Sequence, residues 1–172
     1  RAHFGQLSAQ GSVELIRIAK DKGLPVTADV AMHHLHLTDA AIDGFNAMAH
    51  VRPPLRGEED RAALREGVKS GIIDAICSDH QPLNASAKLA PFPSTEPGMS
   101  TLETVLPLGL ELVRDGVFDE TTLLRALTQK PAAILGLAQA SGWLLIDPAA
   151  QWQVSADTLL SAGKNTPWLG HT

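Results

Sequence analysis

Short apolar runs alternate with amphipathic helical segments along the first half of the chain. Residues 3–7 and 24–30 are apolar runs of strand length, and the segment between them carries an apolar stripe at helical spacing, with Ser12 as its expected N-cap. Gly23 suits the left-handed position at the end of this helix, and Pro25 cannot extend it. A strand, a helix and a strand at this spacing form a βαβ unit, which predicts a parallel sheet with right-handed crossovers.

A third apolar run, residues 72–77, has the length of a strand that is buried on both faces. It follows an expected helix over residues 58–69 and leads into Asp79 and His80. In (β/α)8 barrels, the residues just past the C-terminal end of a strand face the mouth of the active site. Because Asp and His bind metals and move protons, the pair is a candidate catalytic feature. A solvated loop that begins with an Asx-turn is the alternative interpretation.

Composition places the chain among ordinary globular proteins of one domain or slightly more, because 44% of its 172 residues are hydrophobic and 19% are charged. A formal net charge of −5 without a Lys/Arg cluster argues against binding to nucleic acid or to an acidic membrane surface. No apolar run approaches the roughly 20 residues of a transmembrane helix, and residues 1–4 lack a signal-peptide layout. We therefore expect a cytoplasmic protein.

Cysteine and histidine side chains bind metals in many proteins, and both residue types have simpler interpretations here. Cys77 is the single cysteine, which excludes an internal disulfide, and its place in an apolar strand favours a small buried hydrophobe over a nucleophile. His33, His34 and His36 follow the second strand. Adjacent side chains on a regular backbone point in different directions, and no Cys or Glu lies at zinc-finger spacing. We therefore do not expect the three histidines to bind a metal together.

The loop at residues 52–56 is made rigid by two consecutive prolines and carries Arg52 and Arg56. Arginines on a rigid loop are able to hold a carboxylate through paired hydrogen bonds. Alternatively, both arginines pair with neighbouring acids such as Glu58 and Asp60. The residues alone leave these two interpretations open.

The second half of the chain combines a long loop, several helices and a change of pattern near residue 143. Residues 84–100 are rich in proline and poor in aliphatic side chains, which indicates a long ordered loop over the end of the third strand. The short apolar runs 143–148 and 151–154 predict strands of a β unit outside the barrel, followed by a polar tail. The expected helices cover residues 101–115, 120–128 and 132–135.

Three parallel strands cannot close a barrel, because a (β/α)8 barrel needs eight strands and typically about 250 residues. Two architectures remain. The chain either forms a small open α/β sheet, or it is the C-terminal portion of a larger barrel whose earlier strands lie elsewhere.

Several short motifs occur in one order across nearly the whole chain. They are His-Phe-Gly-Gln-Leu-Ser at 3–8, Gly-Leu-Pro-Val-Thr-Ala-Asp-Val at 23–30, His-His-Leu at 33–35, Pro-Pro-Leu-Arg at 53–56, Ser-Asp-His-Gln-Pro at 78–82, Leu-Glu-Thr at 102–104 and Gly-Lys-Asn-Thr-Pro at 163–167. Any one of them alone is a weak signal, but the set is specific. With these motifs in this order, the chain resembles the C-terminal part of the class I dihydroorotases, which belong to the amidohydrolase superfamily.

The resemblance implies an α/β fold in which the three strands are strands six, seven and eight of a TIM-type (β/α)8 metal-dependent hydrolase barrel. It assigns residues 1–137 to the barrel portion. Residues 138–172 are assigned to a tail and to part of a small β-sandwich, which in the family is built from both ends of the chain. The runs 143–148 and 151–154 fall in that sandwich.

The resemblance also implies positions for two of the family's zinc ligands. Asp79 matches the Asp after the eighth strand, which in the family binds metal and acts as general base towards a bridging hydroxide. Gln6 matches a His ligand of the sixth strand. Because an amide oxygen is a poor zinc ligand compared with imidazole, this replacement should cripple the site. The family motif Asp-His-Ala-Pro-His ends in a His that contacts the substrate, and here that position is Leu83.

Further positions carry over by resemblance. Arg52 matches an Asn or Arg that helps to hold the substrate carboxylate, and Gly98 lies where the loop backbone approaches the substrate ring. Asp29 falls where some members have a Glu close to the metals. His33 and His34 do not match principal metal ligands of the family.

The resemblance supports functions of different classes. The first is a catalytically silent dihydroorotase-like subunit of pyrimidine biosynthesis, in which Asp79 is a relic and zinc is absent or weakly bound. Such a subunit supports the assembly of aspartate carbamoyltransferase in a homo- or hetero-oligomer, and the motif at residues 3–8 resembles that branch. The alternative is an active zinc-dependent dihydroorotase that interconverts N-carbamoyl-aspartate and dihydroorotate, with Asp79 as its general base. A hydantoinase-like hydrolase with a single metal is a third candidate.

Overall fold

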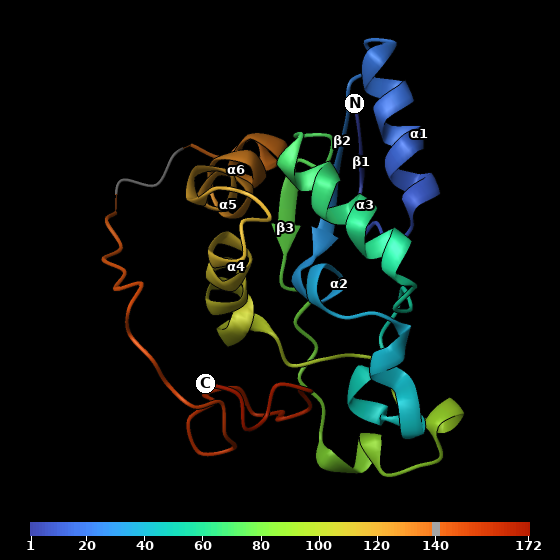
Figure 1. The fold of residues 1–172 in the computed structure, drawn as a ribbon, viewed down its shortest axis with the longest axis vertical. Coiled ribbons are helices and arrows are strands. Elements are labelled where there is room, and N and C mark those ends of the chain that lie inside the picture. The colour runs from blue at the N-terminus through green and yellow to red at the C-terminus, as the bar shows by residue number, and fades with distance from the viewer. Residues whose placement is uncertain (139–141) are drawn as a thin grey trace.

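The structure is a computed structural model that describes residues 1–138 and 142–172. Figure 1 shows a small sheet with helices around it in the upper half of the view, and loops and the C-terminal tail gathered in the lower half. Within the described ranges, none of the helices has the length and apolar character needed to span a membrane.

Three parallel strands form the sheet in the order β1–β2–β3, as predicted. The strands are β1 (Ala2–Phe4), β2 (Val26–Ala31) and β3 (Ala75–Cys77), and each is shorter than or displaced from its predicted run by a few residues. Val30 lies opposite Ile76 in the register of the second pair. Because all three strands run in the same direction, their C-terminal ends lie at one edge of the sheet.

The strands differ sharply in burial. In the central strand β2, Ala28, Val30 and Ala31 are completely buried, whereas all three residues of β1 are exposed. A strand with one neighbour keeps one edge and part of its faces open to solvent. The exposed edge strand agrees with the prediction that the chain is part of a larger barrel.

The predicted helices are present, and α3 has its predicted bounds. Gly23 has a φ of 71° after α1, which confirms the left-handed position expected there. The predicted N-cap was wrong, because α1 begins with Ala9 as its N-cap and the Ser12 N–H already bonds to the Ala9 carbonyl at 3.0 Å. The helices are α1 (Gln10–Asp21), α2 (Met32–His36), α3 (Glu58–Lys69), α4 (Val105–Arg114), α5 (Glu120–Leu127) and α6 (Gln129–Leu135).

Short 3-10 helices order the loops at the C-terminal edge of the sheet. The long loop after β3 contains two of them and is fastened by Lys88, which is 6% exposed and donates from Nζ to the Glu96 carbonyl at 2.7 Å. This agrees with the long ordered loop predicted from its prolines. The 3-10 helices are η1 (Asp39–Phe45), η2 (Ala47–Ala49), η3 (Ala85–Lys88), η4 (Phe92–Ser94) and η5 (Leu102–Thr104).

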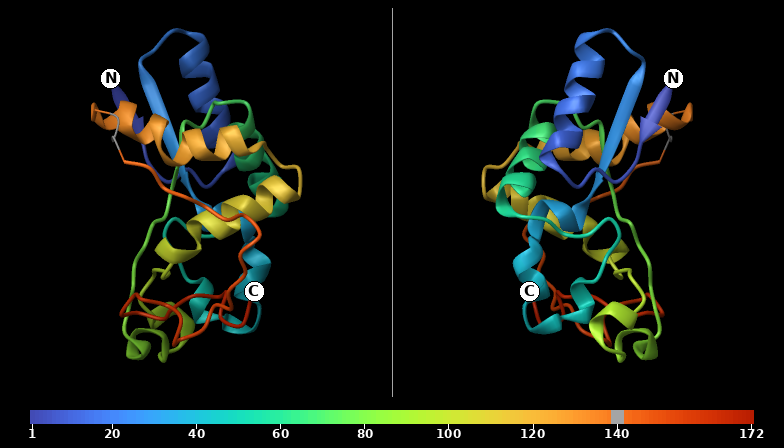
Figure 2. Two further views of the ribbon diagram at one scale, coloured as in Figure 1. Left: turned by 90° about the vertical axis from the view of Figure 1, so that its left-hand side faces the viewer. Right: turned by 90° about the vertical axis from the view of Figure 1, so that its right-hand side faces the viewer.

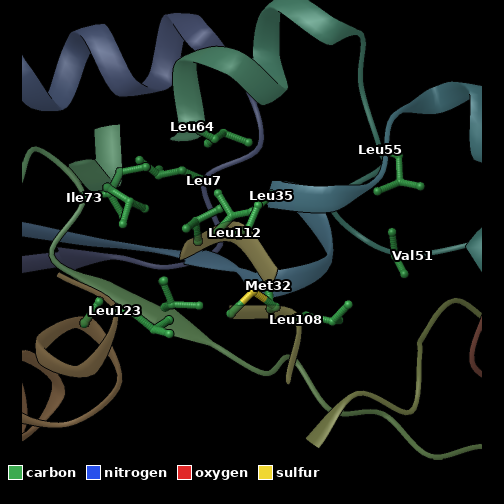
Figure 3. Close-up of a cluster of buried hydrophobic side chains, with 14 of the residues drawn as sticks. Leu7, Met32, Leu35, Val51, Leu55, Leu64, Ile73, Leu108, Leu112 and Leu123 are labelled. Atoms are coloured by element: carbon green, nitrogen blue, oxygen red, sulfur yellow. The ribbon is translucent and has the colours of Figure 1, made fainter. Parts of the chain in front are cut away.

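The hydrophobic core lies where the helices meet the sheet and the loops at its edge (Figure 3). It is built from aliphatic side chains of β2, the surrounding helices and the connecting loops, as expected for a chain with few aromatic residues. Gly67 of α3 leaves room for the Ile73 side chain, because a Cβ at residue 67 would lie 2.9 Å from Ile73 Cδ1. Labelled core residues include Leu7, Met32, Leu35, Leu64, Ile73, Leu112 and Leu123.

The runs 143–148 and 151–154 form no strand in the structure, so this prediction was wrong. A strand needs partners for its backbone groups. Val154 pairs with His171 and Gly170 at 2.8 Å each, whereas the Asp147 carbonyl bonds only within a turn, to the Ala150 N–H at 3.2 Å. Trp143 is fully exposed, at 101%. The described residues contain no second sheet beside these runs. An extended conformation would therefore leave their backbone N–H and C=O groups without partners. The domain boundary at residues 137 and 138 stays a prediction, and residues 139–141 lie outside the described ranges.

Candidate functional site

Gln6 and Asp79 meet at the C-terminal edge of the sheet, where β1 and β3 end. Both residues have left-handed backbone conformations, with φ of 56° and 47°. Such values are uncommon for residues other than glycine and turn the chain sharply after each strand. Gln6 Nε2 lies 2.6 Å from Asp79 Oδ1. Since an ionised carboxylate has no proton to donate, the amide N–H is the donor and the carboxylate accepts.

Asp79 accepts a second amide N–H from the loop that follows it. Gln81 Nε2 lies 3.0 Å from the same oxygen, Oδ1. The Asp79 side chain is only 6% exposed. Burial raises the pKa of its carboxyl, and the hydrogen bonds from Gln81 and Gln6 act in the opposite direction. Neutral amides therefore satisfy most of the hydrogen-bonding capacity of Oδ1.

The other carboxylate oxygen of Asp79 faces His33. His33 Nε2 lies 3.9 Å from Asp79 Oδ2, which is beyond hydrogen-bond distance. The His33 ring is completely buried, and within the described part of the chain neither of its nitrogens has a hydrogen-bond partner. Burial, with a contribution from His34, lowers the pKa of His33 to about 3. The ring is therefore neutral at pH 7 and supplies no positive charge to Asp79.

Asp29, in β2, collects three donors of its own. Its Oδ1 accepts from the Gln6 backbone N–H at 2.8 Å and lies 3.3 Å from Cys77 Sγ. Its Oδ2 lies 2.7 Å from His3 Nε2. Burial, with a contribution from Asp29, raises the pKa of the Cys77 thiol, which is therefore a protonated donor and not a nucleophile. Asp29 ties β1, β2 and β3 together near their C-terminal ends.

Gln81 is held by the long loop and by the C-terminal tail, which lies beside that loop in Figure 2. Its N–H donates to the Met99 carbonyl at 2.8 Å, and its carbonyl accepts from Asn165 Nδ2 at 3.0 Å. Asn165 is 3% exposed and also bonds to the Gly98 carbonyl and the Leu83 N–H, at 3.1 and 2.7 Å. The tail therefore fixes the backbone that carries the Gln81 side chain.

Gly98 makes room for that side chain. Its φ is 139°, and a Cβ at this position would lie 2.8 Å from Gln81 Cβ and 2.9 Å from Gln81 Oε1. A side chain at residue 98 would therefore collide with Gln81 and strain the backbone. The role in substrate binding expected for Gly98 stays a prediction.

His80 does not share the site with Asp79. Its Nδ1 accepts from the Thr101 and Leu102 N–H groups, at 3.1 and 3.0 Å. Through these two hydrogen bonds, His80 anchors the beginning of η5. The candidate Asp-His pair therefore separates into one residue at the site and one that orders the loop.

Arg52 is exposed and, among the described residues, forms no hydrogen bond or ion pair. Arg56 donates to Ser8 Oγ at 3.2 Å, and Glu58 pairs with Arg61 at 2.5 Å. The interpretation in which Arg52 and Arg56 pair with neighbouring acids was therefore wrong. Arg52 is free to contact an anion, and its role in holding a carboxylate stays a prediction.

Gln81 and Asn165 are the site residues that the sequence reasoning missed. Gln81 stands where the family motif has Ala, and that departure was a usable signal. Asn165 lies in a matched motif, but its part in fixing the loop depends on contacts across 67 to 84 residues of sequence. No local pattern reveals contacts of that range.

Gln6 does not fit a zinc ion at Asp79 in the conformation that the structure shows. A zinc site draws on several imidazole, thiolate or carboxylate groups that converge on one point. Across residues 1–138 and 142–172, no three His, Cys, Asp or Glu side chains are grouped to hold a metal ion. At Asp79, Gln6 presents an N–H, which carries partial positive charge and repels a cation.

Comparison with known proteins places the chain in a family. Residues 3–146 match the model of the amidohydrolase family. The chain is 47% identical over 178 residues to a dihydroorotase-like protein of Pseudomonas aeruginosa, and this match covers 99% of the chain and 42% of that relative. It is 41% identical to a dihydroorotase of Trichlorobacter lovleyi, again over 99% of the chain and 42% of the relative. The chain thus spans less than half the length of these relatives.

Solved structures show the same fold. The L-hydantoinase of Arthrobacter aurescens matches with a TM-score of 0.90 and 25% identity, over 98% of the chain and 40% of the hydantoinase. The inactive dihydroorotase-like domain of a CAD-like multifunctional protein from Chaetomium thermophilum matches with a TM-score of 0.72 and 25% identity, over 99% of the chain and 46% of that structure. The chain belongs to the amidohydrolase family and corresponds to the C-terminal part of its barrel hydrolases.

Proposed function

We propose that this chain is part of a dihydroorotase-like protein that has lost dihydroorotase activity. The observation that carries the proposal is the hydrogen bond between Gln6 Nε2 and Asp79 Oδ1, at 2.6 Å. A metal-dependent hydrolase needs its carboxylate free to bind the ion and the water that the ion activates. Here an amide N–H occupies the space beside the carboxylate and supplies neither charge nor a lone pair.

Two further features support a silent site. Leu83 stands where the resemblance expects a His that contacts substrate, and an aliphatic side chain offers no hydrogen bond to a polar ring. The relatives include a protein named dihydroorotase-like and a domain described as inactive. We propose by extension that zinc is absent or weakly bound at Asp79.

The proposed role of the silent protein is to support the assembly of aspartate carbamoyltransferase in pyrimidine biosynthesis. The support is the resemblance of residues 3–8 to that branch of the family and the retention of an ordered fold around Asp79, whose Oδ1 is bonded to amides. In this role the strands, the fastened loop and the tail are kept for their shape and surface.

The proposal is tested with the full-length protein that contains this chain. We expect no hydrolysis of dihydroorotate after saturation with zinc, and we expect the protein to co-purify with aspartate carbamoyltransferase. Transferase assembly, followed by gel filtration and transferase activity, should fail when the protein is omitted. Dihydroorotate hydrolysis together with stoichiometric zinc would overturn the silent function, and an independent, fully active transferase would overturn the assembly role.

One observation favours the alternative of an active zinc-dependent dihydroorotase. Asp79 is retained, and burial raises the pKa of its carboxyl, as is common for catalytic bases. In that alternative Arg52 holds the substrate carboxylate. The hydrolysis assay decides between the two functions, because an active enzyme must lose turnover in Asp79→Asn.

A further inference from the structure

We propose that Gln81 is a second residue that blocks metal binding at Asp79, and that the Gln6 and Gln81 side chains together take the place of a cation there. We call this pair of amides the amide clasp. The inference rests on the proposed function, because a working hydrolase needs Asp79 free to bind its metal. It adds that replacing Gln6 alone leaves the site closed.

The geometry of the amide clasp supports the inference directly. Both amides donate to the same atom, Asp79 Oδ1, at 2.6 Å from Gln6 and 3.0 Å from Gln81. The Asp79 side chain is only 6% exposed, and His33 Nε2 lies 3.9 Å from its Oδ2, beyond hydrogen-bond distance. A buried carboxylate without a nearby cation needs hydrogen-bond donors, and the amide clasp provides them from two separate segments of the chain.

The Gln81 residue is exposed, and the fold holds the backbone that carries its side chain. The backbone on both sides of Gln81 is bonded, to the Met99 carbonyl at 2.8 Å and to Asn165 Nδ2 at 3.0 Å. Gly98 leaves the space that the Gln81 side chain fills, since any Cβ there would lie 2.8 Å from Gln81 Cβ. The loop and the tail thus hold the donor in reach of Asp79.

The two hydrogen bonds at Asp79 Oδ1 affect how a metal ion could reach that oxygen. A cation that approaches Asp79 Oδ1 must displace two N–H groups, both with their partial positive charge towards the oxygen. In a Gln6→His variant, the new imidazole supplies a ligand, but the Gln81 amide still occupies Oδ1. Metal affinity should therefore depend on both positions together.

The experiment measures zinc affinity by chelator competition in full-length protein. The proteins are the unaltered protein, Gln6→His, Gln81→Ala and the double variant. Gln153→His is the matched control, because Gln153 lies in the run 151–154 and its amide bonds to the Gly170 carbonyl at 3.5 Å, not to Asp79. We expect weak zinc binding in both single variants and in the control. The double variant should bind zinc about tenfold or more tightly than Gln6→His.

Three outcomes are decisive. A double variant that binds zinc no more tightly than Gln6→His would overturn the role of Gln81. Full zinc binding by Gln6→His alone would do the same and would leave the silent function standing if the unaltered protein stays metal-free. Stoichiometric zinc in the unaltered protein would instead overturn the proposed function itself.

A thermal cycle tests the Gln81–Asp79 contact without any metal. Tm is measured for Gln81→Ala, Asp79→Ala and the double variant of these positions. We expect the Tm loss caused by Gln81→Ala to disappear in the Asp79→Ala background, because the acceptor is then absent. Additive Tm losses would show that Gln81 does not act through Asp79 and would overturn the proposal.

Discussion

Two carboxylates stand close to the C-terminal edge of the sheet and are satisfied in different ways. Asp29 accepts from a backbone N–H, a thiol and a histidine that belong to the strands and their immediate ends. Asp79 accepts from two side-chain amides, one after β1 and one from the loop after β3. Asp29 therefore holds the fold together, whereas both amide partners of Asp79 bond to a single oxygen of its carboxylate, Oδ1.

The largest effect is expected from Asp29→Ala. The substitution leaves the Gln6 N–H, His3 Nε2 and the Cys77 thiol without their acceptor, and should lower the free energy of unfolding by about 2–4 kcal/mol. Urea unfolding of the full-length protein measures it. Asp43→Ala is the control, because Asp43 is exposed, and should change stability by less than about 0.5 kcal/mol. A loss as small as that of the control would contradict the structural role of Asp29.

Gly98→Ala should have the next largest effect. The added Cβ collides with Gln81 and strains a backbone with φ of 139°, so we expect a loss of about 1–3 kcal/mol. Gly11→Ala is the control, because a Cβ there meets nothing within 4 Å. Urea unfolding compares the two variants. Equal stability of both would show that Gln81 is not packed against Gly98.

Asp79→Asn should have the smallest effect, and its sign should depend on pH. Burial raises the pKa of Asp79 in the native state above its ordinary value of 3.8, so the native state holds this proton more tightly than the unfolded chain does. The contribution of Asp79 to stability therefore falls as the pH rises from the unfolded value through the raised native value, and it is constant above both. Asn removes this dependence, while its amide oxygen still accepts from Gln6 and Gln81.

Unfolding measured from about pH 3 to about pH 7 checks the sign. Relative to the unaltered protein, Asp79→Asn should gain stability over this range, by about 1 kcal/mol or less. A variant that instead loses stability as the pH rises would show that the Asp79 charge is stabilised in the native state, as a bound cation would stabilise it.

Much of the fold follows from local chemistry that is readable in the sequence. The helix over Glu58–Lys69 and the left-handed Gly23 are set by patterns within a few residues, and both were predicted correctly. The strand over 143–148 was not, because a strand forms only where a partner accepts and donates its backbone hydrogen bonds. An apolar run alone does not supply that partner.

The candidate site was predictable only in part, because some of its contacts join residues that are far apart in the chain. The resemblance predicted that Gln6 and Asp79 lie at one site, and in the structure Gln6 Nε2 lies 2.6 Å from Asp79 Oδ1. The hydrogen bonds from Asn165 to the Gln81 and Gly98 carbonyls join segments that are far apart in the chain. Contacts of this kind depend on how the tail folds back over the loop, which neither composition nor periodicity encodes.

The most direct test of a blocked Asp79 is a crystal structure of the full-length protein grown in excess zinc, with anomalous data at the zinc edge. We predict that the Gln6 and Gln81 amides both lie within about 3 Å of Asp79 Oδ1 and that no zinc peak lies beside that oxygen. A zinc peak at coordination distance from Asp79, with the amides turned away, would contradict it.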